Sequence, residues 1–210
     1  RLDVAKPAFC LTYPDDFEKV KSGGRTALKP SAFFKWPSAP LRSGGKTDIS
    51  VYPARRGWED FVMAFTDKKQ SLGWTTLTNT QERWVMYFIR DISVLNATGF
   101  WFSNCGRSYD PWRDRSFNVV GIEDFTSFGP TGLAETVEKK EIRGFPLYHT
   151  LAKNRPLTIN YIMGMAEIPA GFQGVKGLEQ TGKEEITLTG TDGRKLSVKC
   201  RVDFVFKGEI

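Results

Sequence analysis

The chain has 210 residues, of which 40% are hydrophobic and 13% aromatic. This composition excludes a disordered chain and supplies enough apolar residues for one folded domain, which we expect to span residues 1–210. The formal net charge of +6 favours polyanionic partners, but the Lys and Arg residues are scattered in short pairs close to acidic residues. Nucleic acid is therefore not an expected partner.

Cysteine and histidine content limits metal chemistry. Cys10, Cys105 and Cys200 are far apart and form no C-x-x-C pair, and the single histidine, His149, excludes a multi-histidine site. We expect neither a metal nor an organic cofactor. A disulfide between two of the three cysteines stays open, so the sequence does not decide between a cytoplasmic protein and one exported after signal removal. No apolar run reaches the roughly 20 residues that span a bilayer, so no membrane is expected.

Most of the chain predicts strands. Short runs rich in β-branched and aromatic residues recur between Gly, Pro, Asn and Asp, a pattern typical of an all-β sandwich or barrel. The predicted strands cover residues 60–66, 72–78, 83–89, 99–103, 118–123, 157–167, 185–190 and 196–206. In the last of these, apolar and charged residues alternate, which predicts one buried face. The turn Thr191-Asp192-Gly193-Arg194 predicts a closing antiparallel hairpin.

Helical signals are few. Only residues 133–143 predict a short helix, which follows Gly-Pro-Thr-Gly at 129–132. Residues 11–52 are crowded with Pro, Gly, Ser and Lys and contain the pairs Gly23-Gly24 and Gly44-Gly45. Such long loops in a compact domain are usually functional lids or partly disordered segments.

The residues most informative about function lie between 100 and 124. The stretch 100–113 reads Phe-Trp-Phe-Ser-Asn-Cys-Gly-Arg-Ser-Tyr-Asp-Pro-Trp-Arg, and the apolar run 119–122 then leads to Glu123-Asp124. Aromatic rings cover the apolar faces of a pyranose, while Asn, Arg and carboxylate side chains bond its hydroxyl groups. Carbohydrate is therefore the first expected ligand class.

Glu123 has two interpretations. At the end of a buried strand it would be partly desolvated, and its raised pKa would make it a usable general base near neutral pH. The alternative is a structural ion pair with a neighbouring arginine such as Arg107. This stretch alone does not decide between them.

A second cluster has a similar composition. Arg55-Arg56-Gly57-Trp58-Glu59-Asp60 joins a basic pair, a glycine, an aromatic ring and carboxylates, and a predicted strand follows. The alternative is a core position for Trp58 and a solvated turn at Glu59-Asp60. Two such clusters in one β-rich chain favour a shared polar cleft.

In this order the two clusters resemble the aldose 1-epimerase (galactose mutarotase-like) superfamily. Gly57-Trp58-Glu59-Asp60 resembles its Gly-Tyr-Asp-His type motif, and residues 101–106 and 121–124 resemble the elements that carry its aromatic residues and its general base. Residues 40–45 and 103–112 look closer to uncharacterised mutarotase-like proteins than to galactose mutarotases. The resemblance covers about residues 37–128.

This resemblance implies an antiparallel β-supersandwich with few short helices, with Glu123 as general base and Glu59 as a ligand of sugar hydroxyl groups. The family uses two histidines that precede its Gly-Tyr-Asp-His motif, whereas His149 follows both clusters here. Because a family domain is longer than 210 residues, the chain resembles its C-terminal part, without the N-terminal strands.

We therefore expect a carbohydrate-binding, mutarotase-like protein that interconverts aldose anomers by acid–base ring opening. The expected cleft consists of Glu59, Trp101, Asn104, Arg107, Tyr109 and Glu123. One alternative is a non-catalytic carbohydrate-binding or accessory module that uses the same residues. Another is a site for phosphorylated or anionic sugars, bound by Arg55, Arg107, Arg113 or Arg115. The oligomeric state is not predicted.

Overall fold

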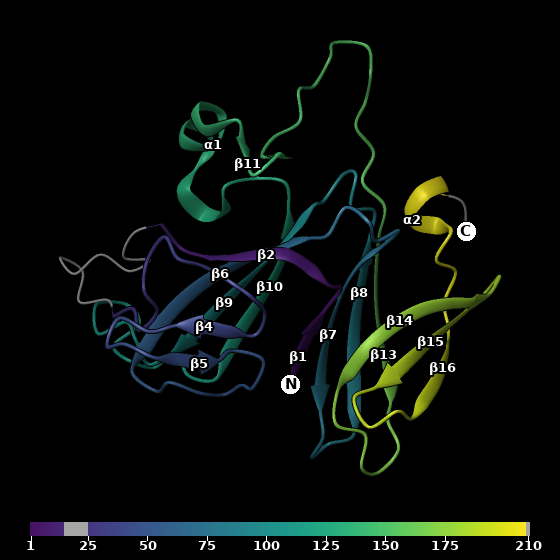
Figure 1. The fold of residues 1–210 in the computed structure, drawn as a ribbon, viewed down its shortest axis with the longest axis horizontal. Helices are drawn as coiled ribbons and strands as arrows, with labels where there is room; N and C mark the ends of the chain where they lie inside the picture. The colour runs from purple at the N-terminus through teal and green to yellow at the C-terminus, as the bar shows by residue number, and fades with distance from the viewer. Residues whose placement is uncertain (15–24, 209–210) are drawn as a thin grey trace.

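The computed structural model describes residues 1–14 and 25–208, and within them the protein is all-β. Its strands form five sheets in which every described pairing is antiparallel. Figure 1 shows three larger sheets side by side, with the helix α1 (Leu133–Lys139) above the first of them. No helix in the described ranges is long and apolar enough to cross a membrane.

The first layer is a five-stranded sheet in the order β10-β9-β6-β2-β3. Its strands are β2 (Pro7–Thr12), β3 (Phe33–Phe34), β6 (Trp58–Thr66), β9 (Ala97–Asn104) and β10 (Val119–Phe125). Strands β10 and β3 are its two edges. Alternation along each strand places one set of side chains on the inner face and the other on the outer face.

The second layer is a four-stranded sheet in the order β1-β7-β8-β13. Its strands are β1 (Leu2–Val4), β7 (Gly73–Asn79), β8 (Trp84–Arg90) and β13 (Tyr161–Glu167). Leu2 of this sheet packs with Val62 and Phe100 of the five-stranded sheet in one apolar core. The fully buried Arg90 also joins the two sheets, because it pairs with Asp124 of β10 at 2.9 Å.

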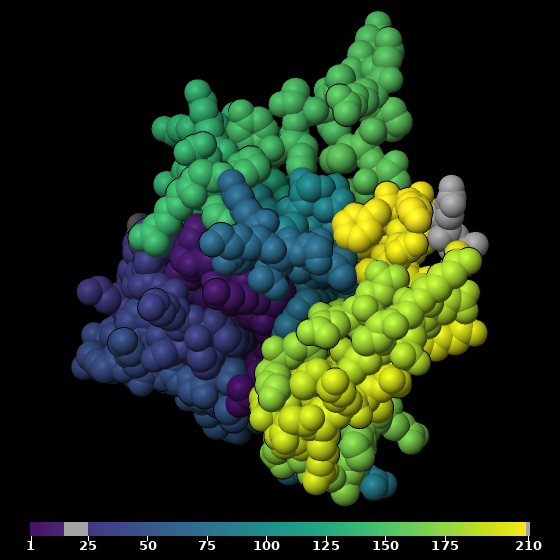
Figure 2. Space-filling model, turned by 45° about the vertical axis from the view of Figure 1, so that its right-hand side comes forward, coloured from purple at the N-terminus to yellow at the C-terminus, as the bar shows by residue number. Residues whose placement is uncertain are grey.

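The third layer is the C-terminal sheet of β14 (Val175–Gly182), β15 (Glu185–Gly190) and β16 (Lys195–Lys199). Its apolar residues pack on the opposite face of the four-stranded sheet, as Leu188 does in the cluster that contains Trp74 and Val85. The space-filling view in Figure 2 shows this sheet in yellow-green against the body of the protein. The predicted hairpin between β15 and β16 is confirmed.

Two small hairpins complete the fold. Strands β4 (Ser38–Pro40) and β5 (Lys46–Asp48) form one, and β11 (Glu141–Ile142) and β12 (Phe145–Pro146) form the other. Phe145 and Phe128 pack with Phe61 on the outer face of the five-stranded sheet, so the segment around α1 covers part of that face.

The prediction of one strand over residues 196–206 is wrong beyond Lys199. The chain turns after β16 and forms the helix α2 (Phe204–Lys207). Val202 and Val205, three residues apart, are both buried in the core between the second and third layers. Helical spacing allows this, whereas residues three apart on a strand point to opposite faces.

The long loop predicted for residues 11–52 is also wrong where the structure describes it. This segment contains β3, β4 and β5, and Leu28 and Ile49 are buried in the core. The pair Gly23-Gly24 lies outside the described residues. The predicted helix 133–143 ends earlier, at Lys139, because the hairpin of β11 and β12 begins at Glu141.

Candidate functional site

The candidate site lies on the outer face of the five-stranded sheet, towards the edge formed by β10. In the register, Glu59 of β6 is opposite Ser103 of β9, and Trp101 of β9 is opposite Gly121 of β10. Opposed residues and residues two apart share a face, so Glu123 lies on this face too. Strand pairing thus joins two clusters that are about 40 residues apart in the sequence.

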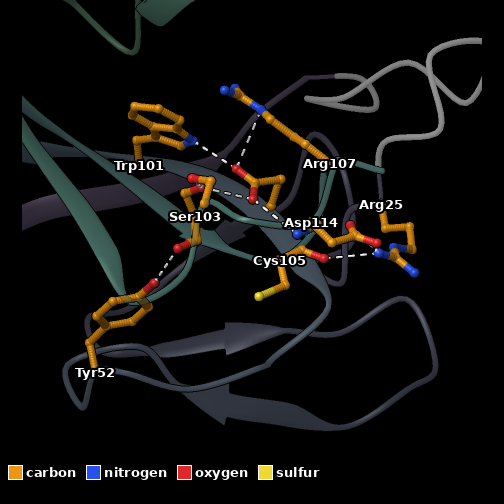
Figure 3. A network of polar contacts seen from close by, with 10 residues as sticks. Arg25, Tyr52, Trp101, Ser103, Cys105, Arg107 and Asp114 are labelled. Carbon is orange, nitrogen blue, oxygen red and sulfur yellow. Dashed lines mark hydrogen bonds and ion pairs between the residues drawn. The ribbon is translucent and has the colours of Figure 1, made fainter. Parts of the chain in front are cut away.

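Glu59 is the centre of a hydrogen-bond network, and Figure 3 shows its partners Trp101, Ser103 and Arg107. Its carboxylate accepts hydrogen bonds from the Trp101 indole nitrogen at 3.1 Å, the Ser103 hydroxyl at 2.8 Å and the Gly106 amide at 3.2 Å. Arg107 Nε lies 3.6 Å from the same carboxylate. Because the exposed fraction of Glu59 is 0%, burial raises its pKa above the usual range.

The structure therefore gives Glu59 a different role from the expected direct contact with a sugar. Its carboxylate is buried and surrounded by donors from the protein itself, so Glu59 positions its neighbours. Gly106 makes this arrangement possible, since a Cβ there would lie 2.4 Å from the backbone nitrogen of Glu59. Any larger residue would push the chain off the buried carboxylate.

Arg107 is stacked between two indole rings. Its guanidinium carbon lies 4.7 Å from the Trp101 ring centroid and 4.9 Å from that of Trp112. Both distances are in the range of cation–π attraction, and the ion pair with Glu59 holds the arginine from a third side. The exposed fraction of Trp112 is 38%, so the stack reaches the surface.

The segment between β9 and β10 carries Arg107 and Trp112 of this stack, and residues remote in sequence hold the segment and the end of β9. Arg25 donates to the Cys105 carbonyl at 2.9 Å and pairs with Asp114 at 2.8 Å, as Figure 3 shows. Tyr52 donates to the Ser103 carbonyl at 2.7 Å. No sequence pattern indicated a role for Arg25 or Tyr52, because only the folded chain brings them to this segment.

Glu123 lies on the exposed edge strand beside Trp101. A Cβ placed on Gly121 would be 3.2 Å from Glu123 Oε1 and 3.3 Å from Trp101 Cβ, so only the bare glycine separates the carboxylate from the indole. The Glu123 carboxylate has no hydrogen-bond or ion-pair partner among the described residues, although the backbone of Glu123 pairs with β9. Desolvation nevertheless raises its pKa. The alternative of a Glu123–Arg107 ion pair is not found, since Arg107 pairs with Glu59.

Two further predicted residues belong to the same region. Asn104 is buried at the end of β9 and donates to the Ala54 carbonyl at 2.8 Å, so it fixes the chain before β6. Tyr109 lies half-buried in the segment after β9, where its carbonyl accepts a hydrogen bond from the Arg113 amide.

The other charged residues considered from the sequence either have partners of their own or are exposed. The Nε2 atom of His149 is 2.7 Å from the Val94 carbonyl oxygen. Arg55 pairs with Asp60 at 3.1 Å on the opposite face of the sheet from Glu59, and Arg113 pairs with Asp110. Arg115 is exposed. Arg113 and Arg115 lie in the same β9–β10 segment as Arg107 and Trp112, whereas Arg55 lies on the other face of the sheet.

Within the described residues, no group of three His, Cys, Asp or Glu side chains could hold a metal ion. The chain matches no protein-family model, no curated protein and no solved structure.

Proposed function

We propose that this protein binds a carbohydrate at the β9–β10 edge and belongs to the mutarotase-like class. The observation that carries the proposal is the exposed Glu123 carboxylate beside the Trp101–Arg107–Trp112 stack. Apolar ring faces, a guanidinium and a carboxylate are the groups that bind a pyranose. The proposed ligand is an aldose or a glycan that ends in one.

The two tryptophans would supply the apolar contact. Trp101 is half-buried and its indole nitrogen is held by Glu59, so its ring is fixed before any ligand arrives. Trp112 is more exposed and stacks on the other side of Arg107. A ring that is already ordered loses little rotamer freedom on binding, which favours affinity.

In the enzymatic version, Glu123 is the general base. It takes the proton of the anomeric hydroxyl, the freed electron pair of O1 forms the C1=O bond, and the bond from C1 to the ring oxygen breaks as that oxygen takes a proton. We assign this last proton to solvent, since His149 contacts the Val94 carbonyl. Rotation and ring closure then give either anomer, with Glu123 returning its proton.

A non-catalytic binding module is the second candidate. It is favoured by the commitment of Glu59 to three hydrogen bonds and an ion pair, which leaves Glu123 as the one carboxylate of the described site open to a ligand. One carboxylate is enough to orient a sugar. General acid–base catalysis commonly uses a second group.

Anomer exchange followed by NMR separates the two candidates. The enzymatic version predicts that the protein accelerates interconversion of the anomers of glucose or galactose and that Glu123→Gln lowers the rate by about 10²–10⁴-fold. Glu138→Gln, an exposed change on α1, is the matched control and should leave the rate unchanged. Saturable sugar binding with exchange no faster than in buffer would select the binding module. Absence of both would reject the proposal.

A further inference from the structure

A cavity lies at the opposite edge of the five-stranded sheet from Glu123, beside β3. Its volume is about 470 Å³, within the ~300–1,000 Å³ of small-molecule sites. The residues on which its chemistry depends are Phe9, Phe33, Lys35, Ser38, Lys46 and Arg143. They come from four separate segments of the chain, so the cavity is a product of the fold.

The charge of this cavity is one-sided. Lys35, Lys46 and Arg143 line it, and no lining residue is acidic. In the part of the chain that the structure describes, none of the three cations has an ion-pair partner. Asp48, two residues after Lys46, instead accepts hydrogen bonds from the amide and hydroxyl of Ser50 at 2.8 and 2.7 Å. The positive charge is therefore not neutralised by a carboxylate in the wall.

Arg143 is held in place before any ligand arrives. It lies in the turn between β11 and β12, where its φ of +51° is uncommon for a residue with a side chain. Its guanidinium carbon is 3.5 Å from the Phe33 ring centroid and 5.2 Å from that of Phe9. Lys68 donates to the Gly144 carbonyl at 2.6 Å and so fixes the same turn.

We propose that this cavity binds an organic monoester of phosphate or sulfate. The tetrahedral anion would meet the Arg143 guanidinium, which matches such oxygens with paired N–H donors, and the ammonium groups of Lys35 and Lys46. The apolar body of the ligand would contact Phe33 and its neighbours. This site is independent of the proposed function, since it uses the other edge of the sheet.

Binding of phenyl phosphate and phenyl sulfate to the whole chain, followed by ¹H–¹⁵N NMR, tests the proposal. At least one ester should bind ten-fold or more tighter than phenol and than inorganic phosphate, with shifts centred on residues 33–35, 46 and 143. Tighter binding of one ester assigns the anion to that class. The proposal would be overturned if phenol or inorganic phosphate bound as tightly as both esters. It would also be overturned if neither ester bound at millimolar concentration, or if the shifts were centred on other residues.

Variants locate the site. Arg143→Gln should weaken ester binding ten-fold or more, Arg143→Lys less, and the control Lys69→Gln not at all. If Arg143→Gln unfolds, the pair Lys35→Gln and Lys46→Gln on the exposed surface gives the same test. Glu123→Gln should bind the ester as the unmodified protein does, whatever its effect on sugars. Unchanged affinity in every cavity variant would contradict the proposal.

Discussion

The indole nitrogen of Trp101 donates a 3.1 Å hydrogen bond to the buried carboxylate of Glu59, 42 residues earlier in the chain. This bond joins the two sequence clusters from which a sugar site was predicted. It also separates their roles. Glu59 is enclosed by the protein and orients the aromatic stack, whereas Glu123 remains at the surface beside it.

Removal of the Glu59 carboxylate should therefore destabilise the whole site. Glu59→Ala leaves the Ser103 hydroxyl, the Gly106 amide and the Trp101 indole without their acceptor and removes the ion partner of Arg107. We expect a loss of about 3–5 kcal/mol in the free energy of unfolding, the usual cost of breaking a buried pair. Urea denaturation measures it. A loss as small as that of the exposed control Glu138→Ala would show that the network is not structural.

The raised pKa of Glu123 gives a prediction for pH. Its folded pKa lies above the ordinary value of 4.5, because desolvation disfavours the charged form. The folded protein therefore holds the Glu123 proton more tightly than the unfolded chain does. This contribution to the free energy of unfolding is fully present below pH 4.5 and is lost as pH rises through the folded pKa. Between pH 4.5 and the folded pKa of Glu123, the free energy of unfolding of the unmodified protein should fall relative to that of the Glu123→Gln variant. NMR titration of the Glu123 side chain gives the pKa directly, and a value at or below 4.5 would contradict the account.

In the enzymatic version of the proposed function, the anomer-exchange rate should also depend on the titration of Glu123, and it should rise with pH where the stability falls. A general base works in its deprotonated form, so the rate should rise with pH through the folded pKa of Glu123 and then level off. A rate that is independent of pH across the measured titration would exclude Glu123 as the base.

Gly121 should be needed for ligand binding more than for folding. A methyl group on Gly121→Ala would lie 3.2 Å from Glu123 Oε1 and 3.3 Å from Trp101 Cβ, so the carboxylate has to move from the indole. We expect weaker sugar binding with little change in unfolding free energy. The matched control is Gly177→Ala, whose Cβ meets nothing closer than 3.8 Å. Equal sugar affinity in the two variants would show that the space beside Gly121 is not used.

The polar bridge between the two larger sheets should contribute to stability. Tyr161 of β13 donates a 2.6 Å hydrogen bond to Asp124, which pairs with the fully buried Arg90 at 2.9 Å. Tyr161→Phe removes one hydrogen bond to a charged group and should cost about 1.5–3 kcal/mol. Thermal and urea unfolding measure this change. Tyr148→Phe, in a half-buried tyrosine outside the bridge, is the control.

The fold class and the strands β6 to β10, β13, β15 and β16 were predictable, because their apolar patterns are strong and their turns carry Gly, Asn or Asp, whereas β11, β12 and β14 were not predicted. Strands β1 and β3 were not, since they have three and two residues and pair with partners far along the chain. The end of β16 was not predictable, because apolar and polar residues go on alternating after Lys199 although the strand ends there and the helix α2 follows.

The site was predictable in composition and less so in role. The sequence indicates both Glu59 and Trp101 as site residues. It does not indicate that Glu59 holds the Trp101 ring, because this contact depends on the strand register, which no local pattern reveals. The cavity with Arg143 was missed for the same reason, since its cations come from different segments that carry no motif.

The most direct test of the proposed sugar site is an NMR titration that follows the tryptophan indole N–H signals while an aldose is added. We expect saturable shifts of the Trp101 and Trp112 signals. The signals of Trp74, which is buried, and of Trp84, whose indole donates to Glu82, should not change. The proposed sugar site would be contradicted if the Trp101 and Trp112 signals stayed in place at high concentrations of several aldoses. The same holds if they moved no more than the signals of Trp74 and Trp84.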